Sequence, residues 1–299
     1  MAIHRTDGDG WVACACGQRH WGRYGAAGLL LVSPEGAVLL QHRAEWSHQG
    51  GTWGVPGGAR SSNEPMHTAA LREAAEEAAV PTSAVELSHA WVEDHRTWSY
   101  TTIVGRAVAP IDAYPSDAES HEIRWVGLDD VSDLPLHPGF AAMWARMRMQ
   151  ALRRLSLIVD AANVVGSRAD GWWRDRLGAN ARLRDALVEP SRDGVPAGPF
   201  GLPGQRWWPR VHLVVEGQAR RLDSVDGVQV HAASRDGDSR IVELTAELAD
   251  RDPADHIVVV TADRALRSAV GSAGASVVGP RTLLDVLPNL ASAQTADHD

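Results

Sequence analysis

The sequence predicts two domains: an α+β domain with a mixed sheet sandwiched by helices over residues 1–152, then an α/β domain with a mainly parallel sheet over residues 153–290. Three observations support this fold class. The 299 residues suffice for about two domains, and 44% of them are hydrophobic, enough for ordinary cores. The first half mixes strands, a Gly-rich loop and helices. In the second half, apolar β-branched runs alternate with helices. We expect the tail, 291–299, to be disordered.

In the first half, short strands surround the Gly-rich stretch "GGTWGVPGG". Pro65 fits the first position of the helix that follows, and Pro81 ends that helix because proline disfavours helical geometry at the residue before it. The predicted elements of this half are strands 24–32, 37–41, 86–93, 98–108 and 123–127 and helices 65–79 and 138–152.

In the second half, continuous runs such as "LSLIVD" and "HIVVVT" indicate strands buried on both faces, as in a parallel sheet. A Pro/Gly-rich loop is expected over about 190–209. The other predicted elements are strands 155–160, 211–215, 228–232 and 256–261, helices near 172–188, 239–250 and from 263, and a last strand and helix reaching about 288.

Composition argues against several classes of protein. No apolar run approaches the roughly 20 residues that span a bilayer, and the N-terminus lacks the apolar segment of a secretory signal. With only Cys14 and Cys16, no disulfide framework is expected. We therefore predict a cytoplasmic protein without a membrane partner. The sequence does not specify an oligomeric state.

The charge is unevenly distributed. The chain carries a formal charge of −9, of which residues 1–152 contribute −7. Residues 168–221 hold ten Arg against six acidic residues, a local excess of +4. The acidic first half suggests a divalent metal, and the local Arg excess permits a polyanionic partner.

The stretch "GGARSSNEPMHTAALREAAEEAAV" gathers three glutamates on one flank of a predicted helix. At 3.6 residues per turn, Glu73, Glu76 and Glu77 lie within one turn of each other. Such like charges repel by roughly a few tenths of a kcal/mol, so water or a metal ion must offset them. Three carboxylates supply the hard oxygen ligands that Mg²⁺ or Mn²⁺ prefers. The alternative is an ordinary solvated helix face.

This segment closely resembles the Nudix box, the signature of the Nudix hydrolases. That pattern is Gly, five residues, Glu, seven residues, Arg-Glu, an aliphatic residue, any residue, Glu-Glu, any residue, Gly and an aliphatic residue. Every charged position matches, and the departures are Ala74 at the aliphatic position and Ala79 at the last Gly. The resemblance implies a Nudix fold over 1–152 and hydrolysis of a nucleoside diphosphate linked to another group, with Mg²⁺ or Mn²⁺ as cofactor.

The resemblance also implies the role of each residue in the box. Glu64 and Arg72 would form a structural pair in which Arg72 orients the glutamates. The metal ligands would be Glu73, Glu76 and Glu77, with the carbonyl of Gly57 as a further ligand.

The general base and the base-stacking residues stay open at this point. Family members recruit the base from the box or from a downstream loop, and "DAESHEIRWVGLDD" offers Glu119 and Glu122. Of these, Glu122 fits the later metal or base position better, and an exposed loop carboxylate is the alternative. Three aromatic residues could stack on a nucleotide base or belong to the core: Trp53, Trp98 and Tyr100.

The stretch "CACGQRH" places Cys14, Cys16 and His20 close together. They could be zinc ligands, since some Nudix relatives carry a zinc ribbon. That ribbon uses two paired-Cys knuckles, whereas this stretch has one C-x-C and no second pair. The pattern therefore favours a remnant or packing role over zinc.

In the second half, acidic residues follow several predicted strands. Asp160 ends the first strand, with Asn163 just after it, and Asp236, Asp238 and Asp263 follow later strands. Sites form at the carboxyl ends of strands in open parallel sheets, so these carboxylates can converge on a metal. The alternative is helix N-capping, for which Asp238 and Asp263 are both well placed.

The motifs "VDAAN", "GDSRIVEL" and "VVVTADRALR" resemble the NYN branch of the PIN-like ribonucleases. This resemblance implies Mg²⁺-dependent cleavage of single-stranded RNA, with Asp160, Asp238 and Asp263 as metal ligands and Asn163 as a supporting residue. Glu216 stands where relatives often have Asp, and it is a longer carboxylate at that position.

Arginines interleaved with tryptophans would suit phosphate contact and base stacking, or a solvated domain interface. They are Arg168, Arg174, Arg176, Arg206 and Arg210, with Trp172, Trp173, Trp207 and Trp208.

The leading hypothesis is thus a Nudix pyrophosphohydrolase fused to a PIN-like domain. Its substrate stays open among ADP-ribose, NADH, oxidised nucleotides and others. One alternative is an RNA-processing or RNA-binding protein whose Nudix domain senses a nucleotide. Another is a purely structural role for the second domain.

Overall fold

The computed structural model describes residues 6–168 and 172–287, and the predicted disordered tail at 291–299 lies outside them. The chain forms two compact units, Met1–Leu152 and Arg153–Asp299. Among the described residues, no helix has the length and apolarity needed to cross a bilayer.

The first unit is built on a mixed sheet. Its strands lie in the order β7-β8-β3-β4-β5, with β6 paired to β3 and β9 paired to β4. The β3–β8 pair is parallel and the other pairs are antiparallel. The strands are β3 Ala26–Val32, β4 Val38–Arg43, β5 Trp53–Gly54, β6 Gly57–Ala59, β7 Val85–Asp94, β8 Ser99–Ala107 and β9 Ser120–Val126.

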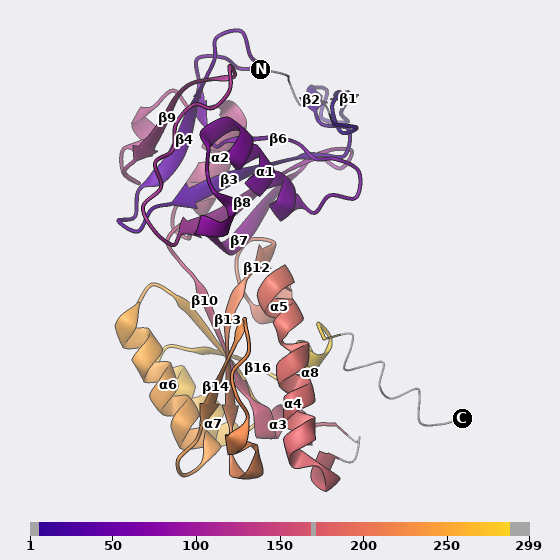
Figure 1. Cartoon of the computed structure of the whole chain (residues 1–299), viewed down its shortest axis with the longest axis vertical. Coiled ribbons are helices and arrows are strands. Elements are labelled where there is room, and N and C mark those ends of the chain that lie inside the picture. Colours follow the sequence, from indigo (N-terminus) through magenta and orange to yellow (C-terminus); the bar gives the residue numbers. More distant parts are fainter. Residues whose placement is uncertain (1–5, 169–171, 288–299) are drawn as a thin grey trace, which may run out of the picture. The chain divides into compact units, whose positions relative to one another are not determined.

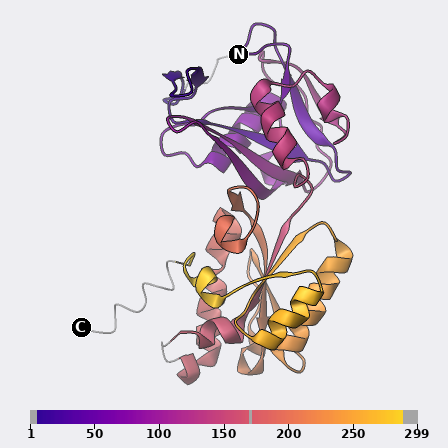
Figure 2. The same cartoon turned by 180° about the vertical axis from the view of Figure 1, so that it is seen from behind.

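Helices α1 (Met66–Ala78) and α2 (Pro138–Met147) cover opposite faces of this sheet (Figures 1 and 2). Successive side chains of a strand point to opposite faces, so Leu30 and Val32 share one core with α2. On the other face, α1 packs on β3 and β8 through a buried alanine stripe that includes Ala74. Two short 3₁₀ turns complete the unit, η1 Thr82–Ala84 and η2 Val131–Asp133.

Three details differ from the sequence prediction. Pro65 is the N-cap of α1 rather than its first helical residue. The predicted helix 138–152 ends at Met147. A short antiparallel hairpin that the sequence did not indicate precedes the sheet, formed by β1 (Trp11–Ala13) and β2 (Arg19–Trp21).

The second unit contains an all-parallel sheet in the order β14-β13-β10-β15-β16. The first strand of this sheet in sequence, β10, lies at its centre. The next two strands, β13 and β14, are added on one side of it, and the last two, β15 and β16, on the other. Such a reversal opens a crevice at the carboxyl ends of the central strands. The strands are β10 Leu155–Asp160, β13 Pro209–Val215, β14 Val228–Ala232, β15 His256–Val260 and β16 Ser276–Val278.

Helices cover both faces of this sheet, as the continuous apolar runs require (Figure 1). Val159 of β10 packs in the core on the side of α3 (Ala161–Gly166), α4 (Arg176–Ala186) and α8 (Pro280–Leu284). Ile158 packs in the opposite core with α6 (Gly237–Arg251) and α7 (Arg264–Ser272).

The prediction was wrong for part of the connection between β10 and β13. The predicted helix 172–188 is a 3₁₀ turn, η3 (Trp172–Arg174), followed by α4. The predicted loop, 190–209, contains most of a further helix because Pro190 stands in its first turn, where no intrahelical amide bond is lost. The elements of this segment are α5 Val188–Asp193, η4 Gly198–Phe200 and the β11–β12 hairpin (Val195–Pro196 and Arg206–Trp207), and η5 Gly217–Arg221 follows β13.

Ala79 gives a stability test of the helix end. It caps α1 with φ 55° and ψ 30°, the left-handed region that costs an L-residue about 1–2 kcal/mol. Ala79→Gly should therefore raise the free energy of unfolding by about 1 kcal/mol, because glycine has no Cβ to strain.

The control is Ala75→Gly inside the same helix, which should lower that free energy by about 1 kcal/mol. Urea denaturation of the full chain measures both, and Ala75→Gly identifies the transition that reports on α1. A lower midpoint for Ala79→Gly would contradict the capping account.

Candidate active site

Arg72 on α1 joins Glu64, which precedes the helix, to Glu73 and Glu76 on the helix. Its Nε and Nη2 donate to the two carboxylate oxygens of Glu64 at 2.9 and 3.1 Å. Its Nη1 donates to Glu73 at 2.8 Å and contacts Glu76 at 3.2 Å, and Nη2 also donates to the carbonyl of Ala59 at 3.0 Å. The planar guanidinium therefore fixes the box glutamates relative to the loop before the helix.

Glu77 lies beneath this network and is 5% exposed. Its Oε2 accepts a hydrogen bond from the amide of Gly57 at 2.8 Å. Burial, followed by the charge of Glu73, raises the pKa of Glu77 well above its usual range. The neighbouring Gly58 likewise lets Glu73 approach the backbone, because a Cβ there would lie 2.7 Å from the carboxylate of Glu73. Glycines in this loop thus let the backbone reach the carboxylates.

Glu73 shares the same low-dielectric environment. Burial raises its pKa to about 7, the charges of Glu76 and Glu119 push it in the same direction, and Arg72 only partly offsets them. Glu76 is more exposed, with 44% of its side chain accessible. Desolvated carboxylates such as Glu73 and Glu77 favour a cation, and with the more exposed Glu76 on the same flank they have the donor chemistry of a magnesium or manganese site.

A loop after β8 brings further carboxylates to the box. The amide of Tyr114 donates to the carbonyl of Ala78, and that of Ser116 donates to the carbonyl of Glu77 at 3.1 Å. These bonds satisfy carbonyls that the end of α1 leaves unpaired. The loop carries Asp117 and Glu119 directly after this docking point.

The charge of Glu119 acts on the box carboxylates, although the sequence analysis preferred Glu122 for the metal or base position. Its charge raises the pKa of Glu73, and that of Asp117 raises the pKa of Glu77. Burial, followed by Asp117, also raises the pKa of Glu119 itself. Glu122 instead lies exposed on β9, where its Oε1 is 3.6 Å from Nε of Arg124. The loop geometry thus favours Glu119 over Glu122.

Arg43, the last residue of β4, is a candidate that the sequence analysis missed. Burial raises the pKa values of Glu77 and Glu119, and the positive charge of Arg43 offsets part of that rise. It is also felt at His137, whose pKa burial and then Arg43 lower to about 4. Arg43 therefore brings a positive charge to the box carboxylates. The only sequence signal was an Arg at the end of a buried strand.

The three candidate aromatic residues do not form one stacking surface. Trp53 is 5% exposed and stacks on His42 with ring centroids 4.8 Å apart. The ring of Trp98 stacks on His20 at 4.2 Å. The hydroxyl of Tyr100 lies against the Gly-rich stretch, since a Cβ on Gly57 would lie 2.7 Å from it.

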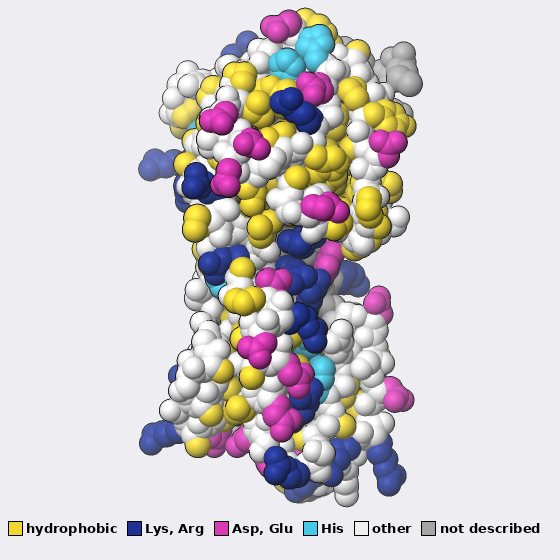
Figure 3. Space-filling model, turned by 90° about the vertical axis from the view of Figure 1, so that its left-hand side faces the viewer, with side chains coloured by type: hydrophobic (Ala, Val, Ile, Leu, Met, Phe, Trp, Pro, Cys, Tyr) yellow, Lys and Arg dark blue, Asp and Glu magenta, His cyan; other side chains and the backbone are white. Residues whose placement is uncertain are grey.

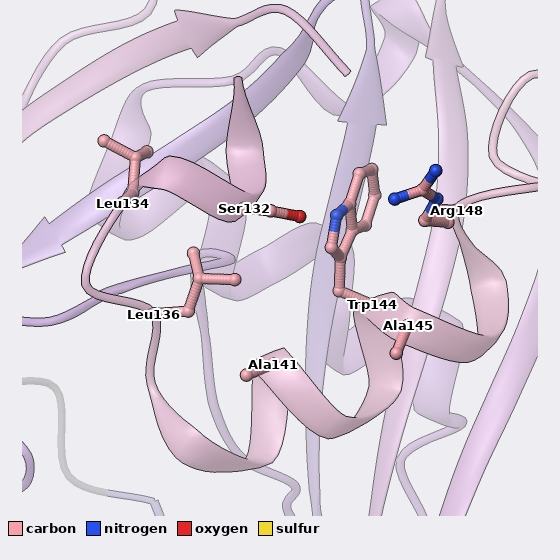
Figure 4. Close-up of a pocket in the computed structure, with 7 residues that line it drawn as sticks. All are labelled: Ser132, Leu134, Leu136, Ala141, Trp144, Ala145 and Arg148. Carbon is pink, nitrogen blue, oxygen red and sulfur yellow. The ribbon is translucent and has the colours of Figure 1, made fainter. Parts of the chain in front are cut away.

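A cavity of about 340 Å³ in this unit lies away from the charged helix, between η2 and α2 (Figure 4). Leucines and the ring of Trp144 form much of its lining, and no carboxylate contributes. It therefore offers no hard ligands for a divalent metal.

In the second unit, three of the four predicted acidic residues, Asp160, Asp238 and Asp263, line one cavity of about 260 Å³ at the carboxyl ends of β10 and β13, and Asp236 does not. This is the crevice expected where the strand order reverses. The lining residues are Asp160, Ala162, Asn163, Val214, Glu216, Gly237, Asp238 and Asp263.

Several of these side chains also make hydrogen bonds that stabilise the fold. Asp160 is 7% exposed and accepts from the amide of Asn163 and the hydroxyl of Thr261 at 3.0 and 2.9 Å. Asp263 caps α7. The cap of α6 is Asp236, so the expectation that Asp238 is well placed as a cap was wrong.

The charges of these carboxylates influence one another. Burial, followed by the negative charges of Asp238 and Glu216, raises the pKa of Asp160. Burial, followed by Asp263, raises the pKa of Asp238. Glu216 accepts from the amide of Gly237 at 2.9 Å, which holds it at the same edge.

Two of the four tryptophans of the predicted Arg/Trp surface belong to the core. Trp207 is fully buried, with its indole nitrogen donating to the carbonyl of Pro203, and Trp208 is 7% exposed. Trp173 is 57% exposed, and the side chain of Trp172 lies outside the described part. The guanidinium of Arg206 donates to backbone carbonyls. On the face that Figure 3 shows, arginines are interspersed with acidic side chains.

Comparisons with known proteins agree with the geometry of the first unit. The NUDIX domain family matches residues 22–147. A Mycobacterium tuberculosis protein named "Putative 8-oxo-dGTP diphosphatase 3" is 53% identical over 154 residues, which is 48% of this chain and 70% of that protein. A Bifidobacterium longum "Nucleoside triphosphate pyrophosphatase/Nudix hydrolase fusion protein" is 43% identical over 155 residues, 48% of this chain and 31% of that protein.

Among solved structures, the Nudix hydrolase RenU from M. smegmatis is 51% identical. The match covers 47% of this chain and 93% of that one, with a TM-score of 0.44. The family match and the curated relatives confirm the resemblance drawn from the box residues. By its domain at residues 22–147, the chain belongs to the Nudix hydrolases.

Proposed function

We propose that the first unit cleaves the phosphoanhydride bond of a nucleoside triphosphate or of a nucleoside diphosphate linked to another group, with Mg²⁺ or Mn²⁺. The observation that carries this is the set of partly desolvated carboxylates that Arg72 holds on one flank of α1. The family supplies the reaction class, a pyrophosphohydrolase.

The side chains present fit a hard divalent cation. Glu73, Glu76 and Glu77 would hold it, with the carbonyl of Gly57 as a further ligand. A bound divalent ion supplies charge neutralisation for phosphoryl oxygens and a lowered pKa for a coordinated water. Arg72 keeps the glutamate oxygens oriented.

Two further residues have proposed roles in the same site. Glu119 lies on the docked loop and has a raised pKa, which suits a carboxylate that removes a proton from the attacking water. Arg43 supplies a fixed positive charge for the phosphate chain of the substrate. Glu122 remains the second candidate for the base.

The names of the relatives suggest an oxidised guanine nucleoside triphosphate as the first substrate to test. ADP-ribose and NADH belong in the same panel, with Mg²⁺ present and products identified by mass spectrometry. Turnover that releases a nucleoside monophosphate supports the proposal. Tight binding without turnover would instead support a nucleotide sensor. The absence of both turnover and binding would contradict the proposed substrate class.

A cytoplasmic location stays a prediction.

Neutralising one metal ligand tests the role of the triad. Glu76→Gln and Glu77→Gln should each lower kcat at least ~100-fold, on the order of 3 kcal/mol of transition-state stabilisation. An amide keeps the shape and can still accept the hydrogen bond from Gly57, so the fold should persist. The control is Glu35→Gln, an exposed turn residue of the same unit, with unchanged kcat. Normal turnover in either triad variant would refute the metal-ligand assignment.

Arg72 separates support from substrate contact. Arg72→Ala leaves Glu64, Glu73 and Glu76 without their shared donor, so stability should fall on the order of 1–3 kcal/mol and kcat should fall with it. Arg72→Lys should restore little, because an ammonium cannot form the forked bonds. Urea denaturation and steady-state kinetics measure the two effects. A variant with full kcat and only a higher KM would make Arg72 a substrate contact.

For the second unit, we propose a PIN-like nuclease domain of the NYN type that cuts single-stranded RNA with Mg²⁺ or Mn²⁺. The supporting observation is the cavity at the strand-order reversal, lined by Asp160, Asp238, Asp263 and Glu216, with Asn163 beside them. The competing account is a structural domain in which Asp160 and Asp263 serve as helix caps.

Asp160→Asn distinguishes these accounts. The full chain with Mn²⁺ should cut a labelled single-stranded RNA, and Asp160→Asn should reduce the cutting at least ~100-fold by removing one metal ligand. RNA binding should survive and weaken with salt, because phosphate neutralisation releases counterions. The control is the exposed Asp226→Asn. If the wild-type chain does not cleave RNA, the nuclease proposal is contradicted and the account of a structural domain is favoured.

A further inference from the structure

The β1–β2 hairpin positions two cysteines and a histidine around a tight turn. The amide of Cys14 donates to the carbonyl of Gln18 at 2.9 Å, and the amide of Gly17 donates to the carbonyl of Cys14 at 3.0 Å. Gly17 has φ 85°, which glycine adopts without strain. The turn brings Cys16 Sγ to 3.1 Å from Nε2 of His20.

A fourth metal-binding side chain comes from the turn between β7 and β8. One ligand atom from each of Cys14, Cys16, His20 and His95 lies within 4.8 Å of the other three, the one such group among the described residues. Zinc bonds of about 2.0–2.3 Å in a tetrahedron would place ligand atoms roughly 3.3–3.8 Å apart, so small side-chain movements would complete the site. The fourth ligand, His95, thus comes from about 75 residues downstream of His20 in the sequence.

The neighbours of the four residues support metal binding. Nε2 of His95 lies 3.2 Å from the carboxylate of Glu93, an arrangement that orients a histidine ligand and leaves Nδ1 for a metal. The sulfur of Cys14 is 3.2 Å from the hydroxyl of Thr97, which can donate to a thiolate. The ring of His20 stacks on Trp98 with an interplanar angle of 9°. Three of the four side chains therefore already have an orienting contact.

Burial weighs against the packing role that the sequence analysis favoured. A free cysteine that packs as a small hydrophobe is normally among the most buried residues. Here Cys16 is exposed, which a packing role does not explain. A hairpin of two three-residue strands also lacks the apolar area to be stable by itself.

We propose that Cys14, Cys16, His20 and His95 form a structural Cys₂His₂ zinc site that ties the β1–β2 hairpin to the turn between β7 and β8. Two thiolates and two imidazoles are the soft and borderline ligands that select zinc over Mg²⁺, so this site and the box carboxylates take different metals. Four protein ligands close the coordination shell, which is typical of a structural rather than a catalytic zinc.

Metal analysis of the full chain tests the proposal. The reduced protein is incubated with zinc, dialysed against excess Mg²⁺ to clear the carboxylates, and analysed by mass spectrometry of the elements. We expect about one zinc per chain. Cys16→Ser and His95→Ala should each lower zinc affinity at least ~10-fold. Gln18→Ala in the same turn and Glu76→Gln in the box should retain zinc.

Cobalt provides a second readout that does not depend on activity. The Co²⁺-loaded chain should show thiolate-to-cobalt absorption and tetrahedral visible bands, both weakened in Cys16→Ser. Circular dichroism checks that the variants keep the sheet. A wild-type chain that retains no zinc, or full zinc retention in Cys16→Ser and His95→Ala, would overturn the assignment.

Discussion

The hydrogen-bond network around Arg72 is the interaction on which the first unit depends. One guanidinium joins the loop residue Glu64 to Glu73 and Glu76, and it also holds the carbonyl of Ala59. Without it, the glutamates on α1 would repel one another next to a desolvated sheet edge. Burial, followed by the neighbouring negative charges, raises the pKa of Glu73 and of Glu77, and Arg72 offsets this only in part at Glu73. A divalent cation would balance the negative charge that Arg72 leaves uncompensated. The arrangement of glutamates that destabilises the fold therefore also provides the metal-binding chemistry.

In the second unit, the topology of the sheet brings several carboxylates close together. Because the strand order reverses at β10, the carboxyl ends of neighbouring parallel strands leave a crevice, and Asp160, Glu216 and Asp238 reach it. Asp160 is held there by Thr261 and by the start of α3. A capping role and a metal-binding role therefore use the same geometry, which is why the structure alone supports both accounts of this domain.

The sequence predicted the elements with strong local signals. The continuous apolar runs of β3, β10 and β15 match strands that are buried almost throughout, and the buried residues of α1 recur at helical spacing. The misses have physical causes. His95 and Arg43 acquire their places through tertiary contacts, which spacing along the chain does not encode. Trp207 and Trp208 pack in the core although their neighbours are polar and glycine-rich.

The most direct test of the central claim is the position of Mn²⁺ in a crystal of the full chain, located by anomalous scattering. The account predicts a peak within ~2.2 Å of carboxylate oxygens from Glu73, Glu76 and Glu77. Arg72 should remain paired with Glu64 in that crystal, since it supports the ligands. A manganese peak elsewhere, with Glu73 and Glu76 still bound to Arg72 and no ion on α1, would contradict the account.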